Sequence, residues 1–498
     1  MRFALVDEKL VPKPLLTTGH PTYPISQINS SCTPQCNSAF DFNPELQTYL
    51  SGRQLLLDEL PFPFAEIQEH YENGYLVYRQ GILLKGKSCK CARCGTTEAR
   101  WFSVFPCARC GENCLYCRQC LMMGRVSSCS ALVSWTGPEP KAATVKQHLL
   151  NWNGTLSHGQ AAASAKTVAA ISQSSELLVW AVCGAGKTEV LFKGIEHSLQ
   201  QGGRVCIATP RTDVVLELTP RLKAAFPRTT VASLYGGSED RHLHAPLTIA
   251  TTHQLLRFYQ AFHTVIVDEV DAFPFSVDKT LQHAVQQARR PGSALVYLTA
   301  TPNRKWQREC LQGKRAYVTI PARYHRHPLP VPKFAWCGNW EKKVLRNTLP
   351  QNVLSWIKHR LNAGKQTLLF APKIASMEKI LPILRKLHPS IESVHAEDPD
   401  RKGKVTKMRN REIPLLLTTT ILERGVTFPN IDVGVLGAED VIFTESALVQ
   451  IAGRAGRSAS FPAGEVVFFH YGKTEAMVRA RSQIMRMNRE GARKGLLD

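Results

Sequence analysis

The feature that most constrains this 498-residue chain is the segment LLVWAVCGAGKTEV, in which an apolar run leads into a turn of small residues and a Lys-Thr pair. A buried strand, a tight turn and a helix start, in that order, surround phosphate oxygens with backbone N–H groups. Lys187 can then reach the β- and γ-phosphates, and Thr188 can hold Mg²⁺. The segment therefore predicts ATP and Mg²⁺ as cofactors, although Ala181 replaces the first Gly of the full motif. The residues expected to hold the phosphates are Gly184, Ala185, Gly186, Lys187 and Thr188.

From Leu177 onward, short apolar runs alternate with longer amphipathic segments, which is typical of a parallel sheet with helical crossovers. The first block of expected strands comprises Leu177–Cys183, Val205–Thr209, Leu247–Thr251, Thr264–Asp268 and Leu295–Thr299. The second block comprises Thr367–Ala371, Leu415–Thr418, Asp432–Leu436 and Glu465–His470. A Pro-rich, basic stretch, PARYHRHPLPVPKF, separates the two blocks as a linker. We expect an α/β fold with two tandem RecA-like lobes, the second ending in a basic helix that begins near Thr474.

The run TVIVDEVDAF predicts a buried strand that ends in two carboxylates. Asp268 suits the coordination of Mg²⁺, and Glu269 suits the activation of an attacking water. A surface acidic pair is disfavoured directly after three apolar residues, because a charge there needs a partner. We interpret both carboxylates as catalytic.

A third catalytic element is QIAGRAGR, from Gln450 to Arg457. Arg454 and Arg457 can form a charged clamp on a γ-phosphate that is reached from a second domain. The alternative, a basic surface helix, is disfavoured because two glycines inside a helix would lower its stability.

Eight of the 15 cysteines fall between Cys89 and Cys120. Two Cys-Ala-Arg-Cys-Gly knuckles occur there, and such turns present two thiolates to one metal. Tight clustering in a long chain favours metal over a disulfide framework. Zn²⁺ is the preferred ion, and an iron–sulfur cluster is the less favoured alternative. The expected ligands are Cys91, Cys94, Cys107, Cys110, Cys114, Cys117 and Cys120.

The sequence leaves the grouping of these thiols open. One site can use both knuckles. Alternatively, Cys91 and Cys94 pair with Cys117 and Cys120, and the remaining three form a second site whose fourth ligand is Cys89 or Cys129. We favour the set Cys91, Cys94, Cys117 and Cys120 as the primary site.

The formal net charge of +22 favours a polyanionic partner, with nucleic acid ahead of an acidic membrane surface. Residues 85–125 carry eight Lys or Arg against two Glu, so a cationic zinc module suits nucleic-acid contact, with a purely structural brace as the alternative. The sequence contains no apolar run of ~18 residues, so we predict no membrane-spanning helix. The start of the chain is a poor signal peptide, which favours an intracellular protein.

Together, the three catalytic elements resemble those of superfamily 2 helicases and translocases, and further motifs of that superfamily fit in chain order over residues 156–472. Gln160 occupies the place of a Gln that reads adenine, and Thr299, Ala300 and Thr301 match the motif that couples hydrolysis to lobe movement. The resemblance implies nucleic-acid contacts at Pro210, Arg211, Thr251, Thr252, Thr419, Arg424 and Gly425.

A Cys-rich module ahead of the lobes, followed by DEVD, PARYHRHPLPVP and TTTILERGVTF, closely resembles the ComFA family of late-competence proteins, from about Tyr78 to the C-terminus. The resemblance implies an ATPase at the cytoplasmic face of the DNA-uptake machinery that drives single-stranded DNA inward. It also implies a membrane channel and the small companion ComFC as partners, and leaves an oligomer possible. The replication-restart helicase shares much of the motor but carries its zinc cysteines inside the second lobe.

We expect four parts: an N-terminal region (1–88), a Cys-rich zinc module (89–129), lobe 1 (130–325) and lobe 2 (326–498). The favoured function is ATP-dependent translocation on single-stranded DNA during natural transformation. A replication-restart DNA helicase or an RNA helicase is the alternative within the motor class. A zinc scaffold with a vestigial ATPase fold is disfavoured, because Lys187, Asp268, Glu269, Arg454 and Arg457 are all present.

Overall fold

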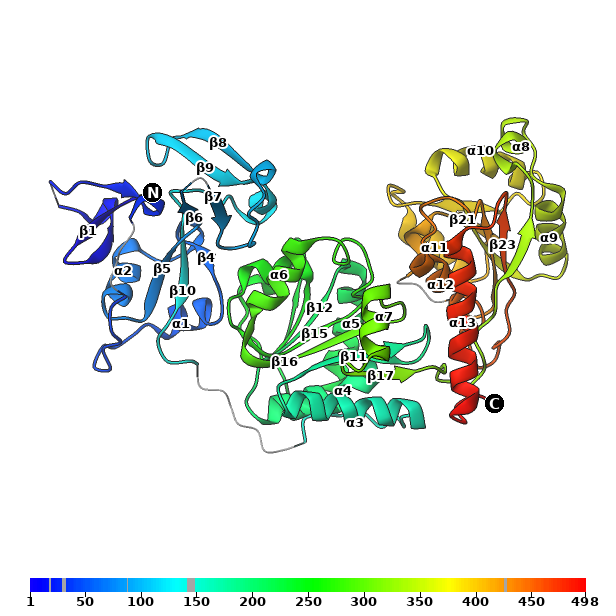
Figure 1. Ribbon diagram of the computed structural model, residues 1–498, viewed down its shortest axis with the longest axis horizontal. Helices are drawn as coiled ribbons and strands as arrows, with labels where there is room; N and C mark the ends of the chain where they lie inside the picture. The colour runs from blue at the N-terminus through cyan, green and yellow to red at the C-terminus, as the bar shows by residue number, and fades with distance from the viewer. Residues whose placement is uncertain (18, 29–32, 87, 141–147, 425–427) are drawn as a thin grey trace. The chain divides into compact units, whose positions relative to one another are not determined.

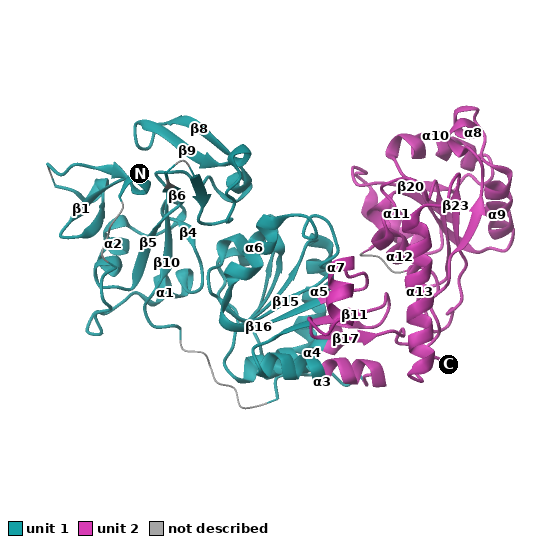
Figure 2. Cartoon of the chain, in the orientation of Figure 1, with its two compact units in different colours: residues 1–154, 166–177, 191–297 teal, residues 155–165, 178–190, 298–498 magenta. Residues whose placement is uncertain are grey.

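The computed structural model describes residues 1–17, 19–28, 33–86, 88–140, 148–424 and 428–498. The chain divides into two compact units, which Figure 2 colours separately. Unit 1 comprises Met1–Gly154, Lys166–Leu177 and Leu191–Tyr297, and unit 2 comprises Thr155–Ala165, Leu178–Val190 and Leu298–Asp498. The first RecA-like lobe contributes to both units, and the second lies wholly in unit 2.

The N-terminal part of unit 1 is built on two small antiparallel sheets (Figure 1). The first has the order β2-β1-β3 and the second β4-β10-β5. Helices α1 and α2 pack with these strands around one apolar core that includes Phe3, Leu46, Ile67 and Val133. The element bounds are β1 (Arg2–Val6), β2 (Lys9–Pro12), β3 (Tyr23–Pro24), α1 (Pro44–Leu50), β4 (Leu55–Leu56), α2 (Phe64–Glu72), β5 (Leu76–Gln80) and β10 (Ala131–Trp135).

Strand β10 follows the Cys-rich segment yet pairs with β4 and β5, which precede that segment. The segment is therefore an insertion between strands of one sheet. The boundary that the sequence suggests at residues 129/130 falls directly ahead of β10.

The Cys-rich segment folds as two antiparallel hairpins, β6 (Ile82–Lys85) with β7 (Ser88–Cys91), and β8 (Phe102–Cys107) with β9 (Glu112–Cys117). Figure 1 shows β8 and β9 in cyan. A short 3₁₀ turn, η5 (Arg118–Met123), follows β9 and carries Cys120. Both hairpins are short and only partly buried, so buried thiols take the place of a larger apolar core.

The lobe-1 strands of unit 1 form a parallel sheet in the order β13-β14-β12-β15-β16. The central strand β12 is buried along its whole length, as expected for a strand covered on both faces. The bounds are β12 (Val205–Thr209), α5 (Thr212–Ala225), β13 (Val231–Leu234), β14 (Leu247–Thr251), β15 (Phe262–Val267), α6 (Lys279–Ala288) and β16 (Arg289–Thr299).

The N-terminal module is fastened to these lobe-1 elements inside unit 1. The Gln54 backbone N–H donates to the Arg257 carbonyl at 2.8 Å, and the Tyr259 N–H donates to the Gly52 carbonyl at 3.0 Å. Gln287 of α6 bridges the two parts, because its side-chain amide donates to Gln54 Oε1 at 3.0 Å and to the Ala92 carbonyl at 3.2 Å. The first Cys knuckle is thus held against α6.

Unit 2 contains the parallel pair β11-β17 and a six-stranded parallel sheet in the order β18-β23-β22-β19-β21-β20. The central strands of the larger sheet are buried throughout, and the long helix α13 contacts α12. Helices α3 and α4 and strand β11 are divided between the units. The bounds are α3 (His158–Ser172), β11 (Glu176–Ala181), α4 (Lys187–Gln200), α7 (Arg304–Leu311), β17 (Tyr317–Ile320), β18 (Lys333–Trp336), α8 (Trp340–Leu345), α9 (Gln351–Asn362), β19 (Gln366–Phe370), α10 (Ile374–Arg385), β20 (Glu392–Val394), α11 (Arg401–Arg409), β21 (Leu415–Thr418), β22 (Ile431–Leu436), α12 (Glu445–Ala452), β23 (Val466–His470) and α13 (Glu475–Arg493).

The expected fold class is confirmed: two parallel-sheet α/β lobes follow a Cys-rich segment. The tail from Thr474 forms α13, with Thr474 as its N-cap. Over the described part of the chain, no helix has the length and apolar character needed to cross a bilayer.

Candidate nucleotide, metal and nucleic-acid sites

The phosphate-binding turn joins β11 to α4 in unit 2, and α4 begins at Lys187. Gly184 and Gly186 have φ values of +81° and +68°, which only glycine adopts without strain. Lys187 and Thr188 are half-buried at the helix start. The backbone N–H groups and the helix dipole at the start of a helix suit a polyphosphate, so the turn fits ATP.

Gln160 of α3 lies against this turn. Its side-chain amide donates to the Ala185 carbonyl at 2.9 Å and to the Gly186 carbonyl at 3.3 Å. Its Oε1 accepts from the Ser157 backbone N–H at 2.8 Å. A Cβ on Gly186 would lie 2.4 Å from Gln160 Nε2, so the glycine is also required for this contact.

The segment QIAGRAGR also belongs to unit 2, where α12 ends at Ala452 and the two arginines follow. Its first residue, Gln450, accepts a hydrogen bond from the Cys183 thiol of the phosphate-binding turn at 2.9 Å. A Cβ on Gly453 would lie 2.6 Å from Cys183 Cβ, so this close approach requires glycine. Gly456 has φ +64° and faces the Pro462 carbonyl, so the second glycine is required as well.

The two arginines of this segment differ in exposure. Arg454 is 2% exposed, and its Nε donates to the Glu423 carbonyl at 2.9 Å. Arg457 is half-buried, and its Nε donates to the Gly453 carbonyl at 3.1 Å. Arg454 therefore stabilises the loop after β21, and Arg457 is the more accessible guanidinium.

Arg323, in the linker between the lobes, is a residue of this site that the motifs do not reveal. It is 1% exposed, and its guanidinium donates to the Gly456 carbonyl and, at 3.4 Å, to the Gly453 carbonyl. The pKa of Arg323 is lowered to about 10, mainly because burial disfavours the charged guanidinium; Arg457 acts in the same direction and Cys183 opposes it. The next residue, Tyr324, donates its backbone N–H to the Gly184 carbonyl at 3.1 Å. The linker thus contacts both the phosphate-binding turn and the arginine segment.

The Thr299-Ala300-Thr301 segment is buried and joined to the second lobe within unit 2. The Thr301 hydroxyl lies 2.7 Å from the Ser446 hydroxyl, and Arg424 donates to Ser446 Oγ at 3.3 Å. Arg424 is 3% exposed, so in this conformation its guanidinium contacts other residues of the protein and is not open to solvent.

Asp268 and Glu269 lie in unit 1, directly after β15. The Asp268 N–H donates to the Ala208 carbonyl at 2.8 Å, which fixes the carboxylate at the carboxyl end of the sheet. Glu269 has φ +54°, a left-handed conformation that costs on the order of 1–3 kcal/mol for a non-glycine residue. Such strain is typical of active-site residues.

The residues expected to contact nucleic acid differ in accessibility. Pro210, Thr251, Thr252 and Arg424 are buried, whereas Arg211 and Thr419 are half-buried. Arg211 is held by its own neighbour, because its guanidinium donates twice to the Asp213 carboxylate at 3.0 and 2.6 Å. Gly425 lies outside the described residues.

A groove of about 750 Å³ in unit 1 lies between the first Cys knuckle and lobe 1. Trp101 and Arg100 line it from the knuckle side, and His253, which follows Thr252, lines it from lobe 1. Phe273, in the loop after β15, also lines the groove and is 78% exposed. The charged residues of the lining are Arg100 and Lys279 together with Glu98 and Asp278. Exposed aromatic rings are the surfaces on which unpaired bases stack.

The structure brings the cysteines together in two groups of four. Group 1 is Cys91, Cys94, Cys117 and Cys120, and group 2 is Cys107, Cys110, Cys114 and Cys129. Within each group the sulfur atoms all lie within 4.8 Å of one another, and every cysteine is buried. Cys129 completes group 2, whereas Cys89 belongs to neither group.

The geometry of group 1 suits a tetrahedral metal. Cys91 Sγ lies 3.7 Å from Cys120 Sγ, and Cys94 Sγ lies 3.5 Å from Cys117 Sγ. Four sulfurs at ~2.3 Å from one ion are separated by about 3.8 Å, whereas a disulfide needs about 2.05 Å. Hydrogen bonds from the neighbouring thiols hold the pKa of Cys120 below its usual value.

Group 2 has matching geometry, with 3.7 Å between the sulfurs of Cys107 and Cys129 and 3.2 Å between those of Cys110 and Cys114. Burial raises the pKa of Cys107, yet backbone N–H groups of Cys110 and Arg109 bring it to about 7. A thiol with that pKa is readily deprotonated for metal binding. Both groups therefore fit Zn²⁺, which thiolates bind in fours.

Comparison with known proteins places these sites in a family context. Three family models match the chain: the competence protein ComFA N-terminal domain at residues 35–134, the type III restriction enzyme res subunit at 153–304, and the helicase conserved C-terminal domain at 347–459. Together with the fold, the last two identify an ATPase of the superfamily 2 helicase type.

Two relatives match nearly the whole chain. Competence protein ComFA of Bacillus subtilis is 52% identical over 91% of this chain and 97% of its own length. Competence protein ComFA of Streptococcus pneumoniae is 38% identical over 87% of this chain and 98% of its own length. Among solved structures, the DEAD-box helicase Mss116 bound to ssRNA and UDP-BeF has a TM-score of 0.50 and 16% identity, covering 67% of this chain and 78% of that chain. That likeness concerns the fold alone.

Proposed function

Because this chain belongs to the ComFA family of competence proteins, we propose that it is an ATP-driven translocase of single-stranded DNA that acts in DNA uptake during natural transformation. The observation that carries the proposal is the hydrogen-bonded link between the phosphate-binding turn and the arginine segment. Cys183 joins Gln450, and the linker residues Arg323 and Tyr324 join both elements. A nucleotide at the turn would therefore be sensed directly by the second lobe.

We assign the chemistry to the residues of the three catalytic motifs. ATP would be held by the turn from Gly184 to Thr188, and its bound Mg²⁺ would neutralise phosphate charge. Asp268 would orient the metal, Glu269 would accept a proton from the attacking water, and the guanidinium of Arg457 would stabilise charge on the γ-phosphate. Arg454 would act by holding the Glu423 loop in place.

Zinc is the metal we propose for both thiol groups. Its role there is structural, because all four positions of each site are filled by protein thiols and none is open to substrate. In our proposal the module, residues 89–129, presents a cationic surface to the single strand, and the groove of Trp101 and Phe273, between the module and lobe 1, receives its bases. A membrane channel and ComFC are proposed partners, and the proposed location is the cytoplasmic face of the cell membrane.

Steady-state ATPase assays with single-stranded DNA, duplex DNA, RNA or no nucleic acid test this proposal. We expect the largest rise in kcat with single-stranded DNA, and affinity that falls steeply with salt because phosphate contacts release counterions. Stimulation by RNA alone would favour an RNA helicase, and unwinding of forked duplexes would favour a replication-restart helicase. Absence of any stimulation would contradict the translocase assignment.

A further inference from the structure

We propose that Gln483, on the C-terminal helix α13, is a positioning residue that couples ATP hydrolysis to the second lobe through the Ala300 carbonyl. The inference rests on the proposed function and goes beyond it, because none of the motifs of the two lobes includes α13.

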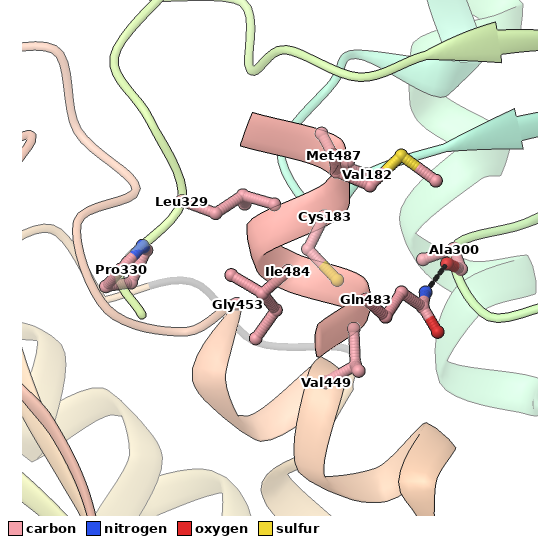
Figure 3. Close-up of a pocket in the computed structure, with 10 residues that line it drawn as sticks. All are labelled: Val182, Cys183, Ala300, Leu329, Pro330, Val449, Gly453, Gln483, Ile484 and Met487. Carbon is pink, nitrogen blue, oxygen red and sulfur yellow. Dashed lines mark hydrogen bonds between the residues drawn. The ribbon is translucent and has the colours of Figure 1, made fainter. Parts of the chain in front are cut away.

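Two side-chain donors from separate elements converge on the Ala300 carbonyl. The Gln483 amide donates at 2.8 Å, and the Trp180 indole N–H, from β11, donates at 3.1 Å. Figure 3 shows the Gln483 nitrogen directed at the Ala300 oxygen. All three residues are 5% exposed or less, so water does not compete for these bonds. The centre of the Thr299-Ala300-Thr301 segment is thus held jointly by the strand before the phosphate-binding turn and by α13.

The surroundings of Gln483 are apolar, which makes an amide an unexpected choice for stability. It lines a small pocket with Val182, Val449, Ile484 and Met487 (Figure 3). Among the described residues, no hydrogen-bond donor reaches its Oε1, which is also buried. A buried acceptor without a partner costs about 1–3 kcal/mol, and an apolar side chain of similar size would avoid that cost. The presence of an amide in this apolar pocket therefore points to a need for the donor itself.

Helix α13 is anchored at further points. Because of these contacts, a displacement of Ala300 would move the helix as a whole and not only the Gln483 side chain. The Asn488 amide both accepts from the Leu329 N–H at 2.8 Å and donates to the Leu329 carbonyl at 2.9 Å, which fixes the linker. Farther along, Lys494 Nζ donates to the Thr319 hydroxyl at 2.8 Å. Thr301, the residue after Ala300, contacts Ser446 of α12. One short segment is therefore tied to α12 and to α13.

The test replaces Gln483 with Met, which keeps the length of the side chain, removes the donor and suits the apolar pocket. We expect the ratio of DNA-stimulated to basal kcat to fall on the order of tenfold or more, because small misplacements of catalytic groups have large effects on rate. The KM for ATP, the Kd for single-stranded DNA and the melting temperature should stay at wild-type values. Gln483→Leu, which is also apolar and has no hydrogen-bond donor, should reproduce the loss.

Trp180→Phe removes the other donor to the same carbonyl, and combined with Gln483→Met it should lower the ratio by less than the product of the two single effects. Ser482→Ala, at an exposed position on the same helix, is the matched control and should behave as wild type. Wild-type stimulation in Gln483→Met, or an equal loss of basal and stimulated rates together with a lower melting temperature, would overturn the inference. A wild-type protein without DNA stimulation would contradict the proposed function instead.

Discussion

The side-chain amide of Gln160 donates a hydrogen bond of 2.9 Å to the carbonyl of Ala185, inside the phosphate-binding turn. The group expected to read adenine is therefore engaged by the turn itself, and its Oε1 is engaged by Ser157. An adenine base that binds Gln160 must exchange these partners, so base recognition and turn conformation are linked.

Replacing Gln160 with Ala should weaken ATP binding and base discrimination together. Loss of one to two hydrogen bonds corresponds to about 1–2 kcal/mol, so we expect the KM for ATP to rise roughly tenfold and the preference for ATP over GTP to diminish. Competition assays with both nucleotides measure this. Gln173→Ala, beyond the C-terminal end of the same helix, serves as the control. An unchanged ATP/GTP preference would refute a base-reading role.

Lys187→Ala should abolish hydrolysis while leaving DNA binding mostly intact. The ammonium group contributes to transition-state charge stabilisation, so kcat should fall on the order of 10²-fold or more. Fluorescence anisotropy with labelled single-stranded DNA, in the absence of nucleotide, checks binding separately from turnover. Lys193→Ala on the same helix provides a matched change in net charge. A Lys187→Ala protein that still hydrolysed ATP would contradict the assignment of the turn.

Arg323→Lys should lower both stability and kcat. A lysine ammonium cannot span the two carbonyls that the guanidinium joins, those of Gly453 and Gly456. We expect a loss of about 1–3 kcal/mol in the free energy of unfolding, because a buried carbonyl loses its partner. Urea denaturation and ATPase assays measure the two effects. Arg326→Lys, at an exposed position in the same linker, should change neither by a comparable amount.

Elemental analysis of the purified protein should find two zinc ions per chain. The double substitution Cys91→Ser with Cys94→Ser should remove one ion, and Cys107→Ser with Cys110→Ser should remove the other, because each pair supplies half of one thiol group. Cys89→Ser and Cys36→Ser, outside both groups, should remove none. A single ion in the wild-type protein, or loss of metal in Cys89→Ser, would contradict the two-site assignment.

Phe273→Ala should reduce affinity for single-stranded DNA without changing basal hydrolysis. Stacking of a base on an aromatic ring contributes about 1–3 kcal/mol, so the Kd should rise roughly tenfold. The same change at Phe461, an aromatic residue that is 38% exposed and lies outside the groove, controls for general loss of apolar surface. Equal affinity for the wild type and Phe273→Ala would exclude this groove from the path of the strand.

How far the sequence predicts the fold depends on burial. Strands β12, β14 and β21 have the expected bounds, because continuous apolar runs mark strands that are covered on both faces. The edge strands were not expected: β13 is only four residues long, and β20, with the sequence ESV, is three. In the N-terminal region, β4 pairs with β10 across the whole Cys-rich insertion, and no local pattern encodes such a distant partner.

In the candidate site, too, some residues were predicted from the sequence and others were missed. The phosphate-binding turn and the arginine segment were found because their backbone requirements restrict the residues that can occupy them. Arg323 was missed because the Pro-rich stretch that contains it was interpreted only as a linker, and Gln483 because its partner Ala300 is 183 positions away. The path of the chain also decides whether Cys89 or Cys129 is the fourth cysteine of group 2, because the spacing of the cysteines alone allowed either.

The two thiol groups alternate along the chain, in the order group 1, group 2, group 1, group 2. On β9, Cys114 and Cys117 are three positions apart and so point to opposite faces of the strand, one toward each group. During synthesis, group 1 is complete only after Cys120 has emerged, and group 2 only after Cys129. Until then up to seven thiols of the two groups are available to the wrong partners. The three-residue step in β9 therefore commits Cys114 and Cys117 to different groups as soon as β8 and β9 pair in register.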